Sequence, residues 1–473
     1  MIRIALPTGD MRRPVAQALA GTPLDSPDYA AGSRVYRLGL PDRGDVTIRV
    51  FRERDIPIQV ALGNYQLGVC GGVWVEELRA RYPAEDLSPL FPLAVGRGRL
   101  AALAAPEQAA QLGPLEEWQR FSGLRVVSEF GNLAEKIVAH LRLRRPRVYA
   151  VYGGAHAYPP EDADIALVHL GEDQQSPDGL VEMASFHESG LWVVANRRAL
   201  AGLDLGEALA SLRPAAAAVE GGLRLPTVAQ SLGGPPLALE RPERPAGVRL
   251  ALPDGHQQPH ALASVRDAGI ELDGYGDADV QLRPRIAVDG VTVKVVRPQD
   301  MPQLVALGQF DMAITGRDWL ADFLACFPDA PVEMAVDLGR SRYHIAAVVD
   351  EDLPATTVDE ALACWHARGR RMIRVASEYP NLADRYARQR RLGRYQVVPI
   401  AGASEGFVPE DAEILIEGSE TGKTIVANRL RVLERVFEST NCVVIHRGRR
   451  DDPVLQGLLE RFRRGVPATT AVT

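Results

Sequence analysis

Lysine is nearly absent from this chain. Among 473 residues only Lys136, Lys294 and Lys423 occur, and arginine supplies almost all of the basic charge. A GC-rich genome is the simpler explanation, yet Lys423 falls in a turn rich in glycine and threonine. The net charge of -7 argues against nucleic acid as a main partner.

Cysteine is also scarce, and long apolar runs are missing. The four cysteines are scattered, without a CxxC pair or a histidine at ligand spacing, which predicts buried thiols in a reducing compartment. No run of about 18 apolar residues occurs, which excludes a membrane-spanning helix. The N-terminal stretch MIRIALPTGD has the pattern of a strand rather than of a signal peptide. The sequence therefore predicts a soluble, cytoplasmic protein.

The chain repeats itself, which predicts a tandem duplication. The matching stretches are VFRERDIPIQVALGNYQLGVCGGVW (50–74) with VVRPQDMPQLVALGQFDMAITGRDW (295–319), LRVVSEFGNLAEKIV (124–138) with IRVASEYPNLADRYA (373–387), and VVANRRAL (193–200) with IVANRLRV (425–432). The offset is 245 residues in the first match, 249 in the second and 232 in the third. This fall in offset predicts an insertion of 17 residues in the first copy, around 171–180.

The duplication predicts a first unit at 1–232, a linker rich in proline and glycine at 233–247, and a second unit at 248–473. Within each copy, short apolar runs alternate with helical periodicity, as in VTVKVV, FDMAITG and IRVAS against MPQLVALG and NLADRYARQRRLG. This alternation predicts an α/β fold with largely parallel sheets. Each copy is long enough to form two lobes.

The turn around Lys423 has the composition of an anion site. In IEGSETGKTIVAN (416–428) an apolar strand leads through small polar residues into a helix, but the loop is one residue too short for a nucleotide-binding P-loop. Backbone N–H groups and hydroxyls there suit a phosphate, and an acid at the strand end suits paired ribose hydroxyls. The alternative is a glycine-containing helix cap with a purely structural role. The predicted site, for a ribose 5-phosphate, consists of Glu417, Gly418, Ser419, Glu420, Thr421, Gly422, Lys423 and Thr424; the family resemblance described next implies phosphoribosyl pyrophosphate as its ligand.

The order of motifs resembles the ATP phosphoribosyltransferase family. The second copy carries LP-x-G, R-x-x-D-M-P, G-x-x-D-M-A-I-x-G-x-D, YPNL and the E-x-x-x-T-G-x-T loop in that order. The resemblance implies two tandem bilobal units with lobes like those of type II periplasmic binding proteins. It also implies phosphoribosyl transfer to N1 of ATP with release of pyrophosphate, the first step of histidine biosynthesis. Mg²⁺, inhibition by histidine and a homo-oligomer are further expectations from the family.

The resemblance also assigns roles to charged residues. Glu417 and Arg297 are the expected catalytic residues, and no protein ligands to a metal are expected. The predicted ATP-binding arginines are Arg283, Arg297, Arg340, Arg342 and Arg52. Arg340 and Arg342 fit a solvated surface pair equally well. Arg52 belongs to the first copy, and its reach into the cleft of the second copy is a hypothesis, the alternative being pairing with acids on its own surface.

Both copies depart from the family pattern. The usual LPKGR start reads LPDGH at 252–256 and LPTGD at 6–10, and Glu405 is the best match to the family's glutamate upstream of the loop. In the first copy the alignment places SGLW (189–192) opposite TGKT, so that Trp192 replaces a hydroxyl donor and Ser185 replaces Glu417. The first copy is therefore expected to be structural or regulatory.

Other classes of function stay open at this point. A catalytically inactive regulatory or small-molecule-binding paralogue is one alternative, and a solute-binding protein would have the same bilobal fold. The sequence leaves undecided the oligomeric state, feedback by histidine, the need for a separate regulatory subunit, and whether the first copy binds any ligand.

Overall fold

The computed structural model describes residues 2–40, 43–83, 86–177, 179–217, 222–228, 234–243, 246–276, 280–420 and 422–466, so parts of the predicted linker at 233–247 lie outside the described residues. The chain divides into two compact units. Unit 1 consists of Met1–Val151, Tyr158–Pro242 and Ile400–Gly406, and unit 2 of Tyr152–Ala157, Glu243–Pro399 and Phe407–Thr473. Each unit contains two large sheets with helices between and around the strands, which confirms the α/β class and the bilobal units.

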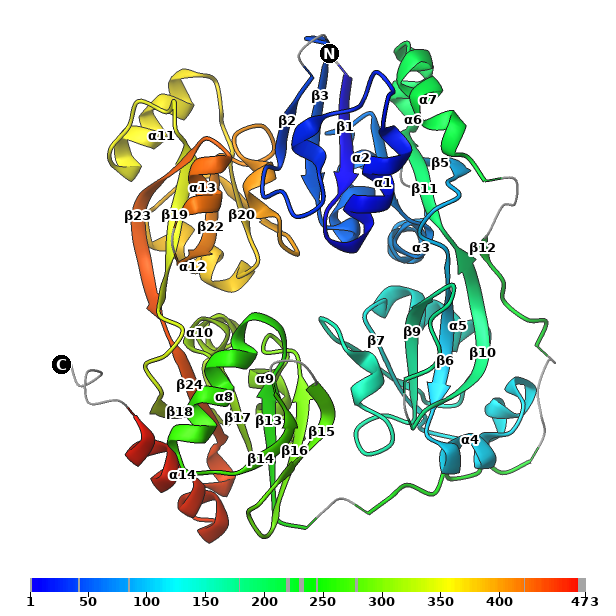
Figure 1. Ribbon diagram of the computed structural model, residues 1–473, viewed down its shortest axis with the longest axis vertical. Helices are drawn as coiled ribbons and strands as arrows, with labels where there is room; N and C mark the ends of the chain where they lie inside the picture. Colours follow the sequence, from blue (N-terminus) through cyan, green and yellow to red (C-terminus); the bar gives the residue numbers. More distant parts are fainter. Residues whose placement is uncertain are drawn as a thin grey trace. The chain divides into compact units, whose positions relative to one another are not determined.

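Unit 1 is built on two six-stranded sheets, one in each lobe (Figure 1). The first sheet has the order β2 (Arg37–Gly39), β3 (Val46–Phe51), β1 (Ile2–Pro7), β4 (Leu67–Gly71), β11 (Leu191–Asn196), β5 (Leu87–Pro92). The second sheet has the order β12 (Gly222–Leu223), β10 (Val181–Ser189), β6 (Gly98–Ala104), β9 (Ile165–Gly171), β7 (Arg125–Ser128), β8 (Arg147–Ala150).

The helices of unit 1 cover these sheets and close two separate apolar cores. They are α1 (Arg12–Leu19), α2 (Ile56–Ala61), α3 (Gly72–Arg81), α4 (Pro106–Leu112), α5 (Gly131–His140), α6 (Arg197–Gly202) and α7 (Gly206–Leu212). Val15 and Leu19 of α1 pack into the first core, whereas Leu133 and Ile137 of α5 pack into the second. Their spacing of four residues places each pair on one helix face.

Unit 2 repeats the plan with two five-stranded sheets and a hairpin. The first sheet has the order β16 (Val291–Val296), β13 (Val248–Pro253), β17 (Met312–Gly316), β24 (Asn441–His446), β18 (Val332–Asp337), beside the hairpin β14 (Leu272–Tyr275) and β15 (Val280–Ile286). The second sheet has the order β21 (Tyr395–Pro399), β20 (Ile373–Ser377), β22 (Ile414–Ser419), β19 (Tyr343–Asp350), β23 (Leu430–Ser439).

The helices of unit 2 also close two cores, one for each sheet. They are α8 (Gln258–Asp267), α9 (Met301–Ala306), α10 (Arg317–Cys326), α11 (Val358–Ala367), α12 (Pro380–Gln389), α13 (Lys423–Ala427) and α14 (Pro453–Gly465). The sequence patterns at 301–308 and 381–393 predicted α9 and α12, and both predictions are confirmed.

The prediction of largely parallel sheets was wrong, because every sheet of four or more strands is mixed. In unit 2, β13 pairs in parallel with β16 and β17, but β24 is antiparallel to both β17 and β18. The cause is that the chain crosses between the lobes of the unit as near-continuous strands. β23 ends at Ser439 and β24 begins at Asn441, so the returning strand enters the first sheet against the direction of its neighbour.

Two side-chain-to-backbone bonds recur at equivalent places in the two units. Asp322 of α10 accepts hydrogen bonds from the backbone N–H groups of Asn381 and Leu382, each at 2.9 Å, at the start of α12. Glu77 of α3 does the same for Asn132 and Leu133 at the start of α5. An acid on α3 therefore caps α5 in unit 1, and an acid on α10 caps α12 in unit 2.

Each unit also takes in a short segment from the other repeat. In unit 1 the Ala401 N–H donates to the Asp55 carboxylate at 2.9 Å, and in unit 2 the Tyr152 N–H donates to the Asp300 carboxylate at 3.1 Å. Asp55 and Asp300 are equivalent at the offset of 245 residues that links the repeats. The two repeats therefore hold one another through the same kind of bond.

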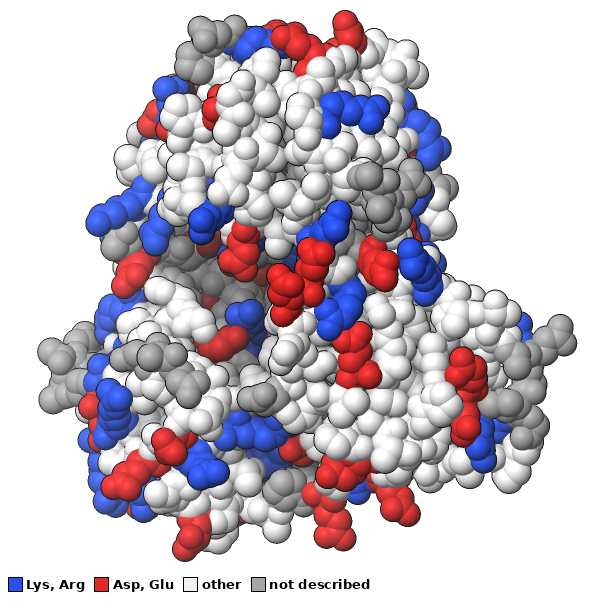
Figure 2. All heavy atoms as spheres, turned by 45° about the vertical axis from the view of Figure 1, so that its right-hand side comes forward, with Lys and Arg blue, Asp and Glu red and all other residues white. Residues whose placement is uncertain are grey.

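Surface and composition agree with the sequence in most respects. The described residues contain no helix with the length and apolarity needed to cross a bilayer. Figure 2 shows acidic and basic side chains intermingled on the face in view, without a broad patch of one sign. Cys70 and Cys442 are buried as predicted, but Cys326 is exposed and Cys364 is partly exposed, so the expectation of four buried thiols was wrong.

Candidate functional site

The predicted phosphate loop joins β22 to α13 in unit 2. Gly422 has φ of +71°, a left-handed conformation that glycine adopts without strain, and precedes the first residue of α13. Its N–H donates to the Ser419 hydroxyl at 3.1 Å, and the Gly418 N–H donates to the Glu417 carboxylate at 3.1 Å. Glu420 is exposed and Thr421 lies outside the described residues. A sharp turn with an exposed Glu420 thus follows the strand that carries Glu417.

A buried polar cluster packs against this loop and supports it. A Cβ atom on Gly418 would lie 2.9 Å from the ring of Tyr343, so the aromatic ring packs directly on the loop backbone. The Tyr343 hydroxyl donates to the fully buried Asp318 carboxylate at 2.7 Å, and the Ser439 hydroxyl donates to its other oxygen at 2.7 Å. Burial, and then the charge of Asp318, raise the pKa of Tyr343, which keeps the phenol as a donor.

Tyr379 completes the cluster from the YPNL motif. Its ring lies 4.4 Å from the ring of Trp319, centroid to centroid, and its N–H donates to the Ser377 hydroxyl at the start of α12. Burial raises the pKa of Tyr379 well above its usual range, with Asp318 the next cause. The YPNL turn therefore begins α12 beside the cluster, and the carboxylate that caps this helix is Asp322.

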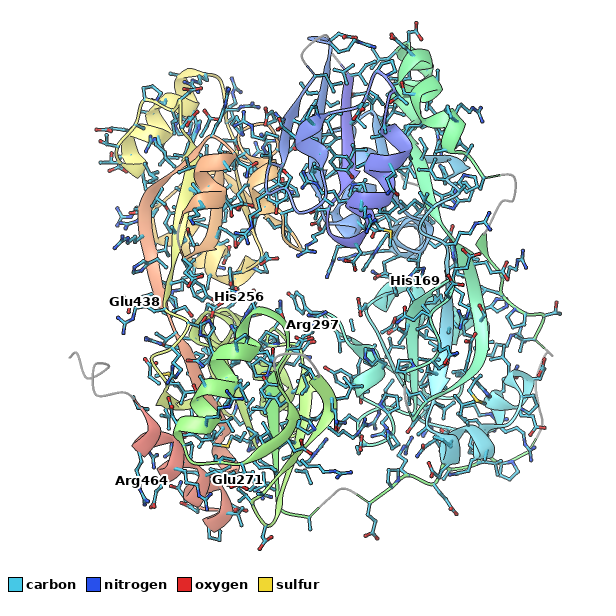
Figure 3. All side chains as sticks on the ribbon, in the orientation of Figure 1. His169, His256, Glu271, Arg297, Glu438 and Arg464 are labelled. Carbon is cyan, nitrogen blue, oxygen red and sulfur yellow. The ribbon has the colours of Figure 1, made fainter. Side chains whose placement is uncertain are left out.

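The predicted ATP-binding arginines of unit 2 are engaged by groups of the unit itself. Arg297 pairs with Asp254 at 3.1 Å, Arg340 with Asp267, and Arg342 with Glu438 at 2.8 Å. Arg283 donates to the Ala157 carbonyl at 3.4 Å. Glu438 points outward from unit 2, whereas Arg297 lies where β16 ends (Figure 3). The structure therefore does not bring Arg342 and Arg297 together.

Arg52 belongs to unit 1, where it directly precedes the short helix Glu53–Asp55. Its guanidinium lies 3.4 Å from the place where a Cβ atom on Gly9 would be. Glu405 also belongs to unit 1 by its segment, and burial raises the pKa of this carboxyl. The reach of Arg52 toward a ligand of the second repeat stays a prediction.

Strand pairing overturns the alignment proposed for the end of the first repeat. Leu191 pairs with Gly71 as Asn441 pairs with Gly316, so β11 and β24 correspond at an offset of 250 residues, not 232. Trp192 lies in β11 opposite Cys70, and therefore fills no phosphate site. The predicted insertion of 17 residues and the assignment of SGLW to the loop were both wrong.

The true counterpart of the loop follows β9. Val168 pairs with Ala101 as Glu417 pairs with Ala346, which places Val168 at the position of Glu417. Ser185 lies instead in β10 and is equivalent to a residue of β23. At the same offset, Lys423 corresponds to Gln174. The counterparts of Thr421 and Gly422 are the acids Glu172 and Asp173, which repel a phosphate.

The packing around this counterpart of the loop in unit 1 is also reversed relative to unit 2. In unit 1 a Cβ atom on Gly98 would lie 2.7 Å from the His169 ring, so the large side chain stands on β9 and the glycine on β6. In unit 2 the large side chain is Tyr343 on β19 and the glycine is Gly418 on β22. Val73 takes the place of Asp318, so no carboxylate anchors this part of unit 1. The expectation that the first repeat lacks a phosphate cradle thus has a different physical basis.

The comparison with known proteins agrees with these motifs. The sequence model of the ATP phosphoribosyltransferase family matches residues 52–210 and 297–464, one stretch in each repeat and together more than half of the chain. The chain belongs to the ATP phosphoribosyltransferase family.

Each relative aligns with a stretch of this chain that is about as long as one repeat. An ATP phosphoribosyltransferase from Chlorobium luteolum is 30% identical over 214 residues, covering 44% of this chain and 66% of the relative. One from Brucella melitensis is 27% identical over 229 residues, covering 46% of this chain and 98% of the relative. This chain therefore spans about two thirds of the length of the Chlorobium relative but nearly all of the Brucella one.

Solved structures show weaker likenesses. An ATP phosphoribosyl transferase complex from Thermotoga maritima has a TM-score of 0.37 and 17% identity, covering 46% of this chain and 98% of that chain. The periplasmic domain of BvgS from B. pertussis has a TM-score of 0.30 and 10% identity, covering 98% of this chain and 88% of that chain.

Three residues near the start of the second ATP phosphoribosyltransferase-like repeat were missed as site candidates. Asp254 pairs with Arg297, and burial raises the pKa of the Asp254 carboxyl. His256 and His260 lie one helical turn apart, with ring centroids 6.0 Å from each other. The sequence signal for these three residues was that LPDGH lacks the basic residues of the family's LPKGR start. This difference shows which cations are missing but not which groups take their place.

Proposed function

We propose that the second repeat transfers the phosphoribosyl group of phosphoribosyl pyrophosphate to N1 of ATP, releasing pyrophosphate, in the first step of histidine biosynthesis. The first repeat has a structural or regulatory role in this proposal. The observation that carries it is the contrast between the two loops. Unit 2 offers glycine backbone, a serine hydroxyl and Lys423 after β22, whereas unit 1 offers two acids after β9.

The reaction requires little acid–base catalysis by the protein. The lone pair on the adenine N1 forms a bond to C1 of the ribose, and the bond from C1 to the pyrophosphate oxygen breaks with its electron pair leaving on pyrophosphate. A neutral ring nitrogen attacks, so no strong base is required. Positioning of the two substrates and stabilisation of the leaving charge supply most of the rate.

The residues of the loop divide this work. The N–H groups of the turn and Lys423 hold the 5-phosphate, and Glu417 accepts hydrogen bonds from the ribose hydroxyls. Tyr343 holds the loop backbone in position by packing against Gly418. Arg297 stabilises charge on the polyphosphates after exchanging its partner Asp254 for the ligand, since its side chain is 42% exposed.

Mg²⁺ forms part of the proposal as an ion carried on the polyphosphate. The described residues contain no group of three or more His, Cys, Asp or Glu side chains placed to hold a metal. A phosphate-bound Mg²⁺ needs only one or two protein carboxylates, and the exposed Glu420 in the loop fits that requirement. When bound, Mg²⁺ would supply positive charge against the departing pyrophosphate, with Glu420 as a protein ligand.

Arg52 of the first repeat is kept as an ATP-binding residue in this proposal, on the ground of family membership. Histidine as an inhibitor and self-association of the chain complete the proposal, on the ground of family membership.

Exchange of one residue between the loops tests the assignment. Lys423→Gln places the first repeat's residue in the second loop and removes one charge-assisted hydrogen bond to phosphate. That bond is worth about 1.5–3 kcal/mol, so kcat/KM for phosphoribosyl pyrophosphate is expected to fall roughly 10- to 150-fold. The measurement is pyrophosphate release from ATP and phosphoribosyl pyrophosphate by the full chain.

Gln174→Lys is the matched control in the first repeat. It places a lysine at the equivalent position and is expected to leave kcat/KM within about twofold of the unaltered chain, since Glu172 and Asp173 remain beside it. If Gln174→Lys changes turnover while Lys423→Gln does not, the catalytic repeat has been assigned to the wrong half. Absence of turnover in the unaltered chain would support an inactive paralogue instead.

A further inference from the structure

Three of the arginines predicted to bind ATP in the second repeat are engaged by carboxylates, and of these only Arg297 is proposed to exchange its partner for the ligand. Arg297, Arg340 and Arg342 each pair with a carboxylate of unit 2. The phosphate loop contributes one cation, Lys423. The proposed substrates and the leaving pyrophosphate each carry several negative charges, so further donors are needed near the loop.

Two histidines stand where such donors are required. His256 lies in the short helix Gly255–Gln257 directly after β13, and His260 lies in α8, one turn later. Their rings meet edge to face with centroids 6.0 Å apart. Figure 3 shows His256 at the end of its lobe that faces the second lobe of unit 2, the same end at which Arg297 lies. His256 is exposed and His260 is half-buried.

These two rings differ from the neighbouring cations in their partners. Among the residues that the structure describes, neither histidine has a carboxylate within ion-pair distance, in contrast to Arg297 beside them. The charges of Glu420 in the phosphate loop and of Arg340 both act on the pKa of His260. Because His256 lies at the lobe end that faces the second lobe of unit 2 (Figure 3), the two histidines remain available to a ligand bound beside the loop.

The pair occurs in the second repeat alone. The first repeat aligns LPTGDMRRP (6–14) with LPDGHQQPH (252–260), so Asp10 stands in place of His256 and Pro14 in place of His260. An acid and a proline cannot donate to a phosphate. The histidine pair and the phosphate loop are thus both confined to the repeat proposed to be catalytic.

We infer that His256 and His260 are ligands for the polyphosphate group bound opposite the phosphate loop of unit 2, with His260 as the proton-dependent one, an inference that rests on the proposed function. His260 binds the anion as a protonated donor and releases its proton when the anion leaves, and His256 donates a ring N–H beside it. Affinity for pyrophosphate, and for the triphosphate of a nucleotide, consequently falls as the pH rises through neutrality.

The surrounding charges fix the sign of this dependence. Burial lowers the pKa of His260, His256 and Arg340 act in the same direction, and Glu420 opposes them. The unliganded ring of His260 thus holds its proton less tightly than an exposed imidazole does. A bound polyanion stabilises the protonated form, so binding takes up a proton. Affinity then falls by up to about tenfold per pH unit where His260 must be protonated.

The experiment measures binding of inorganic pyrophosphate to the full chain by calorimetry in metal-free buffer, between about pH 6 and about pH 8. Ratios of affinity between variant and unaltered chain are compared at each pH, so that the titration of pyrophosphate itself cancels. His256→Gln and His260→Gln are made singly and together. His366→Gln is the matched control, because His366 is exposed on α11 in the same unit.

The expected result is a loss that depends on pH. His260→Gln binds about tenfold or more weakly near pH 6 and almost normally near pH 8, and the double variant shows a loss that likewise shrinks as the pH rises. His260→Arg keeps a fixed charge and is expected to retain the affinity near pH 8 that the unaltered chain loses. The control follows the unaltered chain at every pH. Both histidines have exposed surface, so the variants are expected to keep the unaltered thermal unfolding midpoint.

The inference is overturned if the double variant tracks the unaltered chain across the whole range. It is also overturned if the loss is equal at every pH, because a fixed contact would then explain it. The proposed function fails by a separate sign, the absence of phosphoribosyl transfer in the unaltered chain at any pH. Binding of pyrophosphate that still depends on the two histidines would then support the inference alone.

Discussion

Replacing Asp318 by valine, the residue of the first repeat, tests whether the buried cluster holds the phosphate loop in place. Asp318 has no exposed surface and accepts hydrogen bonds from the hydroxyls of Tyr343 and Ser439, each at 2.7 Å. Asp318→Val leaves both hydroxyls without this acceptor. Tyr343, which packs on Gly418, then loses the bond that fixes its ring.

The magnitude follows from the bonds that are lost. Two hydrogen bonds to a charged acceptor are worth about 3–6 kcal/mol together. The valine removes the cost of burying a carboxylate, which offsets part of this loss. A net destabilisation of unit 2 by about 2–4 kcal/mol is therefore expected, a large share of the stability of a single domain. Asp318→Asn keeps one oxygen acceptor and is expected to cost about 1–2 kcal/mol.

A local measurement is needed because two units in one chain need not unfold together. Hydrogen exchange followed by mass spectrometry is expected to show lost protection in α10 and β19 of Asp318→Val, with α3 and β6 of unit 1 unchanged. kcat/KM for phosphoribosyl pyrophosphate is expected to fall at least tenfold, with Asp318→Asn between the two. Normal protection of β19 together with normal turnover in Asp318→Val would refute the supporting role of the cluster.

Two further predictions concern stability. Burial raises the pKa of Glu53 to about 7, well above its value of 4.5 in an unfolded chain, so unit 1 loses stability as the pH rises from about 4.5 to about 7. Glu53→Gln can keep the 2.8 Å bond to the Gly71 N–H. It is expected to stabilise unit 1 by up to about 3 kcal/mol near pH 8 but not near pH 4, which urea unfolding at each pH would measure. Equal effects at the two pH values would contradict this prediction. Asp322→Ala removes the cap of α12 and is expected to cost about 2 kcal/mol, visible as faster hydrogen exchange in residues 380–389; unchanged exchange there would exclude the cap.

Features set by local sequence could be predicted well. The strand of β22, the turn at Gly422 and the helix after it follow from apolar residues, small polar residues and glycine within a dozen positions. The YPNL motif likewise predicted the start of α12. In each case the physical cause lies in neighbouring residues, so a single sequence contains it.

Features set by pairing between distant strands could not be predicted. VVAN occurs at 193–196 and IVAN at 425–428, but the first lies in β11 and the second in α13. The register of β11 depends on Gly71, which lies 120 positions earlier in the chain. A match of a few letters contains no trace of that partner. The carboxylates that engage Arg340 and Arg342 are distant in the chain for the same reason.

What the first repeat kept and what it lost separate folding from chemistry. Gln66 accepts the Arg3 N–H at 2.7 Å, as Asp311 accepts the Arg249 N–H at 2.8 Å, so the substitution preserves the bond that joins two strands. Glu77 likewise preserves the helix cap made by Asp322.

The differences gather around the loop instead. Val73 replaces Asp318, Val168 replaces Glu417, and Asp10 replaces His256. Random decay of a whole repeat would remove the strand and helix bonds as readily as the loop. Their retention fits a first repeat that must still fold, and the differences at the loop, the cluster and the histidine pair fit the role proposed for these three features in the second repeat.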